Sequence, residues 1–179
     1  MSEPTWGDSG ERPPAPGEIV RGLEESGAEV VAACAELTAE DWRRGAYENG
    51  WNARQVLAHI ASIEWSYPRV IDLARQVRDG TGSGRGSMRG GNDAYNARQV
   101  ALRDEVPVEG LVEEFRRNRS ATIDAVRAAE PELWGIRIRS AGGIVGPLAT
   151  VFWVVAVEHV RMHARDMTGA RPDSGPPAA

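Results

Sequence analysis

The amino-acid sequence predicts an all-α protein built as a four-helix bundle. Four segments repeat apolar residues at the helical period, whereas the alternation typical of a strand never exceeds four residues. A length of 179 residues suits one domain with a core of its own. Amphipathic helices without strands bury their apolar stripes against one another. We therefore expect one bundle over residues 17–168, between disordered tails at 1–16 and 169–179.

Composition restricts the classes of function. The net charge of −5 and the isoelectric point near 5.3 argue against a nucleic-acid surface, because such surfaces are basic. The single cysteine, Cys34, excludes an intramolecular disulfide and a thiolate zinc cluster. Its place on an apolar stripe favours a core residue over a catalytic thiol. The sequence shows no secretory signal and no apolar run long enough to span a bilayer, so we expect a cytoplasmic protein.

The first bundle helix is expected over residues 17–37. Its apolar positions recur at helical spacing, while glutamates between them face water. Gly22 and Gly27 count against this prediction, because a glycine inside a helix costs about 1 kcal/mol relative to alanine. The apolar stripe consists of Ile19, Leu23, Val30, Val31 and Cys34.

A second, long helix is expected over residues 52–77. Asn52 is a suitable N-cap, and Pro68 should kink the helix because proline cannot donate the backbone hydrogen bond of that turn. His59 lies in the middle of the buried face. The other residues of that face are Val56, Ile60, Ile63, Tyr67, Val70 and Ile71.

Residues 79–92, DGTGSGRGSMRGGN, have the composition of a flexible linker. The segment does not match a phosphate-binding loop, since neither G-x-G-x-x-G nor G-K-[ST] occurs and a helix rather than a strand precedes it. Two interpretations remain for Arg85 and Arg89. They are either solvated loop residues or contacts for an anionic ligand at the mouth of a pocket.

The second half of the chain predicts a short helix at 94–102 and two further bundle helices. Pro107 suits the first turn of the third long helix. Residues 133–146 are expected to be a connection without a sheet, because alternation at 136–139 is too short to predict one. Pro147 opens the fourth long helix, which Gly169 and Pro172 should end.

The three histidines of the chain are candidate metal ligands. His159 and His163 are four residues apart, and side chains at this spacing share one helix face with Cβ atoms about 5–6 Å apart. His59 belongs to the apolar face of another helix. An imidazole in an apolar core costs free energy unless its nitrogens are paired, and one shared ion would pair all three rings. We therefore predict a metal site formed by His59, His159 and His163.

Three protein ligands leave a coordination position open, which is typical of a catalytic ion. Such an ion can polarise a substrate oxygen, lower the pKa of a water to about 7, or keep a thiol deprotonated. The ligands alone do not choose between these. Asp166, three residues beyond His163, is expected to orient an imidazole from behind. The sequence contains neither H-E-x-x-H nor G-x-S-x-G, so no zincin protease or serine hydrolase is indicated.

Two segments resemble a known superfamily. Residues 51–59, WNARQVLAH, resemble the segment W-[ST]-x-x-x-[VIL]-[VIL]-x-H of the DinB-like (YfiT-like) superfamily. Residues 158–166, EHVRMHARD, resemble its closing helix, which carries H-x-x-x-H. Within the superfamily the chain is most similar to the actinobacterial proteins related to mycothiol-dependent maleylpyruvate isomerase. The resemblance covers residues 17–168.

The resemblance implies a bundle of up-down-down-up topology with a divalent metal on His59, His159 and His163. Zinc is the expected ion, with nickel and manganese as alternatives. The resemblance further implies a low-molecular-weight thiol such as mycothiol, and thiol transfer to, or isomerisation of, a small electrophile. The isomerase pattern has Glu at the position of His159, where this chain has the His of the broader superfamily. The isomerase also carries a C-terminal domain, for which we expect no room in 179 residues.

Three hypotheses follow for the function. The chain is a metal-dependent thiol transferase or isomerase, a metal-dependent hydrolase that needs no thiol, or a non-catalytic bundle of the stress response that binds metal or uses its histidines structurally. The expected partners are a small electrophile and a thiol, with neither nucleic acid nor membrane. A homodimer through an exposed helix face is compatible with the sequence.

Overall fold

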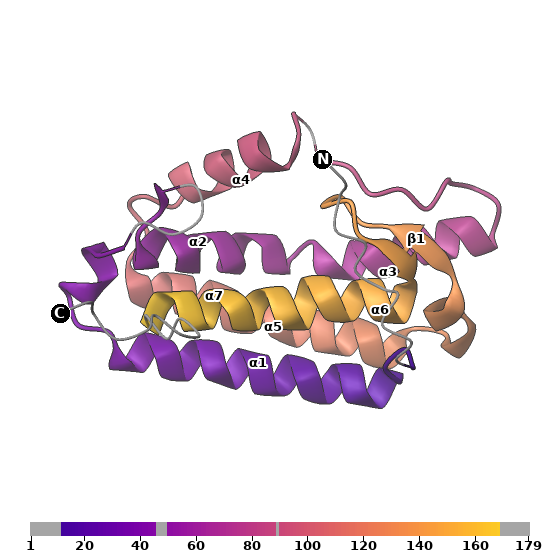
Figure 1. Ribbon diagram of the computed structural model, residues 1–179, viewed down its shortest axis with the longest axis horizontal. Helices are drawn as coiled ribbons and strands as arrows, with labels where there is room; N and C mark the ends of the chain where they lie inside the picture. Colours follow the sequence, from indigo (N-terminus) through magenta and orange to yellow (C-terminus); the bar gives the residue numbers. More distant parts are fainter. Residues whose placement is uncertain (1–11, 46–49, 89, 169–179) are drawn as a thin grey trace, which may run out of the picture.

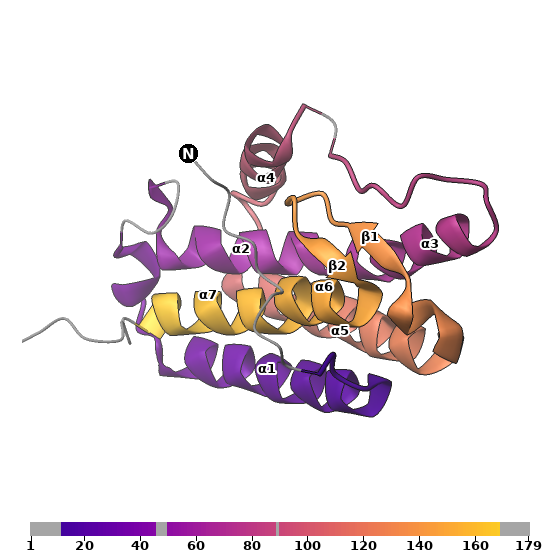
Figure 2. The same cartoon turned by 45° about the vertical axis from the view of Figure 1, so that its right-hand side comes forward.

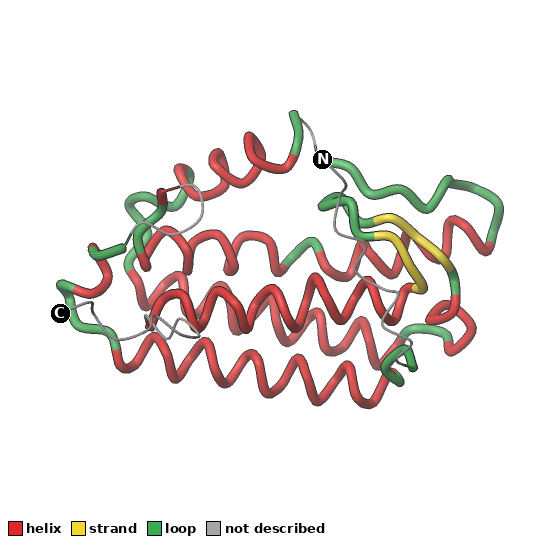
Figure 3. The backbone as a smooth tube through the Cα atoms, viewed as in Figure 1, coloured by secondary structure: helices red, strands yellow, loops and turns green. Residues whose placement is uncertain are grey.

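The computed structural model describes residues 12–45, 50–88 and 90–168. Its bundle consists of four long helical segments that lie side by side (Figures 1 and 3). The segments are α1 (Pro16–Glu36), α2 followed by α3 (Ala53–Glu64 and Tyr67–Arg78), α5 (Val108–Ala128), and a fourth made of α6 (Leu148–Trp153), the π-helical turn η4 (Val154–Glu158) and α7 (His159–Thr168). The predicted all-α bundle is confirmed.

The topology of the bundle is up-down-down-up. In Figure 1 the sequence colours advance from right to left along α1 and α6–α7, and from left to right along α2 and α5. Helix α1 contacts α5 and α7, and α2 contacts the same two helices. Because α2 and α5 are parallel, the chain must return along the bundle between them. Residues 79–88 and 90–91 and the short helix α4 (Asn92–Ala101) belong to this return, with α4 packed on α2 (Figure 2).

The expected second helix is broken rather than kinked, which corrects the sequence prediction. Helix α2 ends at Glu64 and α3 begins at Tyr67, so that Pro68 falls in the first turn of α3. Proline has no N–H to donate to the carbonyl four residues earlier, that of Glu64. The Thr122 hydroxyl on α5 donates to this carbonyl instead, at 3.3 Å. A neighbouring helix thus satisfies the buried group that the proline leaves unpaired.

A small β-hairpin occupies the connection before α6, where the sequence predicted no sheet. Strands β1 (Arg137–Arg139) and β2 (Val145–Pro147) are antiparallel and bring Ile138 opposite Gly146. The predicted flexible linker contributes to it, because Arg139 exchanges backbone hydrogen bonds with Gly84 and Gly86. A Cβ at Gly86 would lie 2.7 Å from the Ala141 nitrogen, so this close backbone approach requires glycine.

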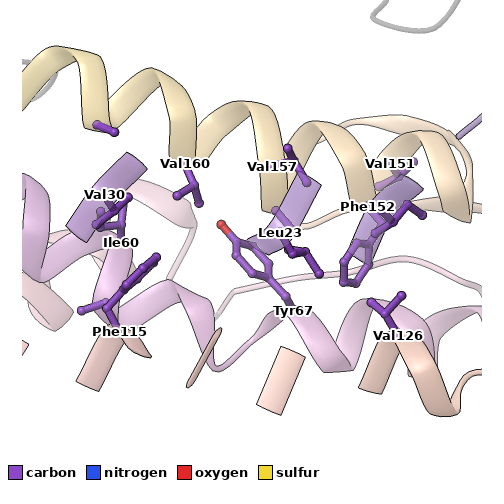
Figure 4. Packing of buried hydrophobic residues seen from close by; sticks show 14 of the residues in the cluster. Leu23, Val30, Ile60, Tyr67, Phe115, Val126, Val151, Phe152, Val157 and Val160 are labelled. Carbon is purple, nitrogen blue, oxygen red and sulfur yellow. The ribbon is translucent and has the colours of Figure 1, made fainter. Parts of the chain in front are cut away.

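The hydrophobic core runs along the bundle axis between the four segments (Figure 4). It includes Leu23, Val30, Ile60, Phe115, Val126, Val151, Phe152, Val157 and Val160, each at most 1% exposed. Full burial of side chains of this size contributes about 1.5–3 kcal/mol each.

One of the two glycines that counted against α1 has a packing role. A Cβ at Gly22 would lie 2.6 Å from the Trp153 ring, and one at Gly27 would lie 3.5 Å from the Arg119 side chain. Gly22 therefore gives room to the Trp153 ring, at the helix-propensity cost noted above, whereas the space at Gly27 would accommodate an alanine.

Some expectations fall outside what the structure tests. Within the described residues, no helix has the length and apolar character needed to cross a membrane. The predicted tails lie outside the described residues except for residues 12–16, and so do Gly169 and Pro172. Helix α7 is described to Thr168.

Candidate metal centre

His59 of α2 and the pair His159 and His163 of α7 converge at one place in the bundle. Their nearest ring nitrogens all lie within 4.8 Å of one another. The ring centroids are 5.5 Å apart for His59 and His159, 5.2 Å for His59 and His163, and 4.6 Å for His159 and His163. His59 is 3% exposed and His163 is 2% exposed, while His159 is half-buried. The structure thus brings together the three histidines that the sequence singled out.

The start of α2 fixes the position of His59. The Asn52 side chain accepts a hydrogen bond from the Gln55 backbone at 2.9 Å, and the Gln55 side chain accepts one from the Asn52 backbone at 3.0 Å. This reciprocal cap confirms Asn52 as the predicted N-cap and fixes where the helix begins. Trp51, directly before the cap, places its ring 5.1 Å from the His59 ring. The tryptophan and histidine of one sequence motif therefore meet in space.

The π-helical turn η4 orients His159. The His159 backbone N–H bonds to the carbonyl of Val154, five residues back, which leaves the Val155 carbonyl without this N–H. The imidazole of His159 is itself hydrogen-bonded to the Val155 backbone. That bond raises the pKa of the ring, so the imidazole donates and the Val155 carbonyl accepts. A metal-binding histidine typically makes such a bond with one nitrogen and presents the other to the ion.

All three imidazoles are neutral at neutral pH. Burial, and then the charges of the other two histidines, lower the pKa of His59 to about 3. Burial followed by the charge of His163 lowers the pKa of His159 to about 3, and burial lowers that of His163 to about 4. Metal binding requires deprotonated ligands. These rings therefore present lone pairs without first losing a proton.

An unpaired nitrogen of His59 and the spacing of the rings fit a bound divalent ion. The Nδ1 atom of His59 is buried without a hydrogen-bond partner among the described residues. The Nε2 atoms of His159 and His163 lie 3.0 Å apart. Two nitrogens on a tetrahedral zinc ion, with bonds of about 2.0–2.1 Å, would be about 3.3 Å apart. Only a small adjustment therefore separates the observed pair from a chelating one.

Asp166 lies beside the His163 ring. Its Oδ2 is 3.4 Å from Nδ1 of His163, and its charge works to raise the pKa of His159 against the larger effect of burial. This location suits the predicted orienting role.

A cleft of about 250 Å³ opens over the histidines. His59 and His159 form part of its wall, together with Tyr67 of α3 and two residues of α4, Asn92 and Asn96. Sequence analysis placed Tyr67 on the buried face that carries His59, but it assigned a site role neither to Tyr67 nor to the two asparagines. The four-residue spacing of the two asparagines placed them on one face of the short helix, but nothing in the sequence indicated which element that face would meet.

A second cleft of about 450 Å³ adjoins the first and shares Tyr67 with it. Arg85 lines it, as does Arg69, whose guanidinium lies 3.7 Å above the Trp65 ring. Neither arginine forms an ion pair within the described parts of the chain. Arg89, the other predicted ligand contact, lies outside the described residues.

Cys34 has the properties of a core residue. It is half-buried and packs against the hydrophobic core of the bundle. Burial raises the pKa of its thiol to about 11, which suppresses the reactive thiolate. Cys34 does not line either cleft.

Comparisons with known proteins agree with this arrangement. The family model of the mycothiol maleylpyruvate isomerase N-terminal domain matches residues 23–168. The chain belongs to this family. A comparison with curated proteins finds no match.

Two solved structures have the same fold as the chain. A crystal structure of the mycothiol-dependent maleylpyruvate isomerase matches 86% of the chain with a TM-score of 0.65 and 14% identity, and the chain spans 61% of its length. YfiT from Bacillus subtilis, a probable metal-dependent hydrolase with an unusual four-helix bundle topology, matches 94% of the chain and 90% of its own length, with a TM-score of 0.66 and 16% identity. At these identities the matches establish the fold alone.

Proposed function

We propose that this member of the family is a metal-dependent enzyme that brings a low-molecular-weight thiol, such as mycothiol, to a small electrophile. His59, His159 and His163 hold the divalent ion, with zinc as the expected metal and nickel or manganese as alternatives. The observation that carries the proposal is the convergence of three neutral imidazoles, two of which, those of His59 and His159, line a cleft. The family match supports the thiol as the cosubstrate.

The ion, when bound, supplies a Lewis acid that lowers the pKa of a thiol or a water in its open position. The chain supplies the remainder of the site. Asn92 and Asn96 line the first cleft, and Nδ2 of Asn92 donates to the Ala141 carbonyl at 3.0 Å. In this proposal the amide oxygen of Asn92 and the amide of Asn96 hold the polar part of a ligand by hydrogen bonds. Arg85, on the second cleft, attracts an anionic group of the electrophile. The apolar walls of both clefts exclude water from the reacting groups.

The experiment compares untagged wild-type protein with the variants His59→Ala and His159→Ala. Metal content per chain is measured by mass spectrometry, and conjugation of a maleimide-type electrophile is followed with and without added thiol. We expect about one equivalent of metal in the wild type, loss of that metal in both folded histidine variants, and thiol-dependent turnover in the wild type but in neither histidine variant. The variant Cys34→Ala is the matched control, because it removes the only cysteine and should change neither quantity.

Metal-dependent hydrolysis is the second candidate, favoured by the presence of three histidines and by the fold shared with YfiT. It predicts cleavage of an ester or amide that needs the metal but no thiol. Wild-type protein that takes up no zinc, nickel or manganese contradicts both enzymatic candidates and leaves a non-catalytic bundle. The expected homodimer and cytoplasmic location stay predictions.

A further inference from the structure

A buried group of charged and polar side chains lies in the bundle next to the π-helical turn η4. Arg119 of α5 is 4% exposed, and Glu64 at the end of α2 is fully buried. Their side chains approach to 2.9 Å, between Nη2 and Oε2. Nη1 of Arg119 donates to the Ser26 hydroxyl of α1 at 3.4 Å. A guanidinium and a carboxylate are costly to bury, so their presence here requires an explanation beyond simple core packing.

The third contact of Arg119 reaches the π-helical turn. Nη1 of Arg119 donates a hydrogen bond of 3.0 Å to the backbone carbonyl of Ala156. Ala156 lies at the centre of η4, three residues before His159. One guanidinium therefore joins residues from all four segments of the bundle. Its contact on the fourth segment is with the irregular turn that immediately precedes the two histidines of α7.

The geometry of η4 sets the direction in which His159 points. A π-helical turn places one more residue in the turn than an α-helix does, and each residue of an α-helix rotates the chain by about 100°. If η4 became α-helical, the side chains of α7 would rotate about the helix axis by about 100° relative to those of α6. The Val155 carbonyl would also accept the His159 backbone N–H, and would lose its role as partner of the imidazole. A π-helical turn is unfavourable by itself, so a tertiary contact must stabilise it.

Side chains and backbone of several helices surround Arg119. Helix α1 passes close to it, since a Cβ at Gly27 would lie 3.5 Å from the Arg119 side chain, at an ordinary van der Waals distance. The Phe115 ring is 5.1 Å from the guanidinium carbon, one turn earlier on α5. Tyr67, a wall residue of both clefts, points from α3 toward the helix that carries Val157 and Val160 (Figure 4). Burial raises its pKa, and the charge of Glu64 raises it further. Tyr67 thus stands between this polar group and the clefts.

We propose that Arg119, held by Glu64, is a positioning residue that stabilises the π-helical turn and thereby aims His159 at the metal site. The inference rests on the proposed function for its metal. It assigns to the buried ion pair a role in the geometry of the site that is separable from its role in stability. Neither residue touches the ion or the reacting groups in this proposal.

The test separates positioning from stability with the double variant Glu64→Met/Arg119→Met. Replacing a buried ion pair by apolar residues of similar size often leaves a protein as stable as before, whereas removing one partner destabilises it. We expect the double variant to fold, with a dissociation constant for zinc about 10- to 100-fold weaker than that of the wild type, as measured by chelator competition. Arg119→Lys is the second variant, because it keeps the charge beside Glu64 but loses the two-armed donor. It should weaken zinc binding in the same direction.

The matched control is Arg103→Met/Glu114→Met. This pair also joins an arginine and a glutamate, with side chains 16% and 18% exposed, and it links the α4–α5 connection to α5 away from η4. Zinc affinity should be unchanged in this variant. Equal zinc affinity of the wild type, the Glu64/Arg119 double variant and Arg119→Lys would overturn the inference.

A measurement on metal-free protein tests the inference apart from the proposed function. The tautomer of each imidazole is read from long-range ¹H–¹⁵N correlations of histidine-labelled protein. We expect His159 to carry its proton on the nitrogen that faces Val155 in the wild type, and to lose this preference in the Glu64/Arg119 double variant but not in the Arg103/Glu114 control. An unchanged His159 tautomer in the folded double variant contradicts the inference. Absence of metal from the wild type would contradict the proposed function only.

Discussion

The Nε2 atoms of His159 and His163 face each other at 3.0 Å across one turn of α7, inside a region where burial keeps both rings neutral. Two neutral imidazoles can share one hydrogen in such a contact, but the third ring, His59, then has a buried nitrogen without a partner among the described residues. A divalent ion would satisfy all three rings at once. Without metal, this arrangement of rings is stable only at a pH at which the three rings stay uncharged. The dependence of folding stability on pH therefore tests the site.

The stability of the metal-free protein should fall as the pH drops below about 6.5. Each histidine has a folded-state pKa of about 3 to 4, below the ordinary value of 6.5, so between these values the unfolded chain binds more protons than the folded one. The contribution of the histidines to the free energy of unfolding is complete above pH 6.5 and falls toward pH 4. It falls by about 1.4 kcal/mol per pH unit for each histidine that stays neutral in the folded protein. Burial raises the pKa of Glu64, which acts in the opposite sense, since its contribution is lost as the pH rises.

The measurement is the free energy of unfolding in urea, with chelator present, at intervals from pH 7.5 to 4.5. The variant His59→Gln removes one of the three titrating rings. It should reduce the slope of the unfolding free energy against pH by the equivalent of one bound proton, or about 1.4 kcal/mol per pH unit. Parallel curves for wild type and variant would contradict neutral burial of His59 in the folded state.

Asp166→Asn should weaken metal binding while leaving the fold intact. The carboxylate lies 3.4 Å from Nδ1 of His163 and is expected to orient the ring and increase its basicity. Loss of such a partner typically costs about 10- to 100-fold in metal affinity. The control is Glu158→Gln, which removes an exposed carboxylate of the same helical segment that pairs with Arg161. Zinc titration of both variants decides the matter, and equal affinities would rule out an orienting role for Asp166.

Gly22→Ala should destabilise the protein although alanine is the better helix former. The new methyl group would lie 2.6 Å from the Trp153 ring, and overpacking of this kind costs about 1–3 kcal/mol. Gly17→Ala, in the same helix, meets nothing within 4 Å and should stabilise by up to about 1 kcal/mol. Thermal melts of the two variants should therefore shift in opposite directions. A melting temperature for Gly22→Ala at or above the wild-type value would show that Trp153 relocates without cost.

The sequence predicted the parts of the structure that depend on local patterns. Apolar periodicity predicted the long helical segments, and Asn52 predicted the start of α2. Spacing and burial predicted the histidine cluster, because two histidines one helical turn apart on an apolar face lie together in the core against whichever helix packs there. The break before Pro68 exceeded the predicted kink because Thr122, on another helix, offers the Glu64 carbonyl an alternative donor. No local pattern contains that information.

The features that sequence analysis missed arise from contacts between distant segments. The hairpin forms because residues 84–86 dock on Arg139, and the π-helical turn is held from α5 by Arg119. Arg119 follows the charged residues Arg116 and Arg117 in the sequence, a pattern typical of a solvent-facing side, yet it is 4% exposed. Tyr67, Asn92 and Asn96 join the cleft only through the packing of α3 and α4 over the histidines.

Arg85→Gln should impair turnover of anionic electrophiles selectively. Arg85 lines the second cleft and forms no ion pair inside the described residues, so its charge is available to a ligand. An exposed charge contributes up to about 1 kcal/mol, which corresponds to an increase in KM of about 3- to 5-fold with little change in kcat. The effect should shrink at high salt and be absent for an uncharged electrophile.

Arg137→Gln is the matched control, because Arg137 is also exposed, on β1, but lines neither cleft. Equal KM increases for charged and uncharged electrophiles, or for the two variants, would exclude Arg85 as the anion contact.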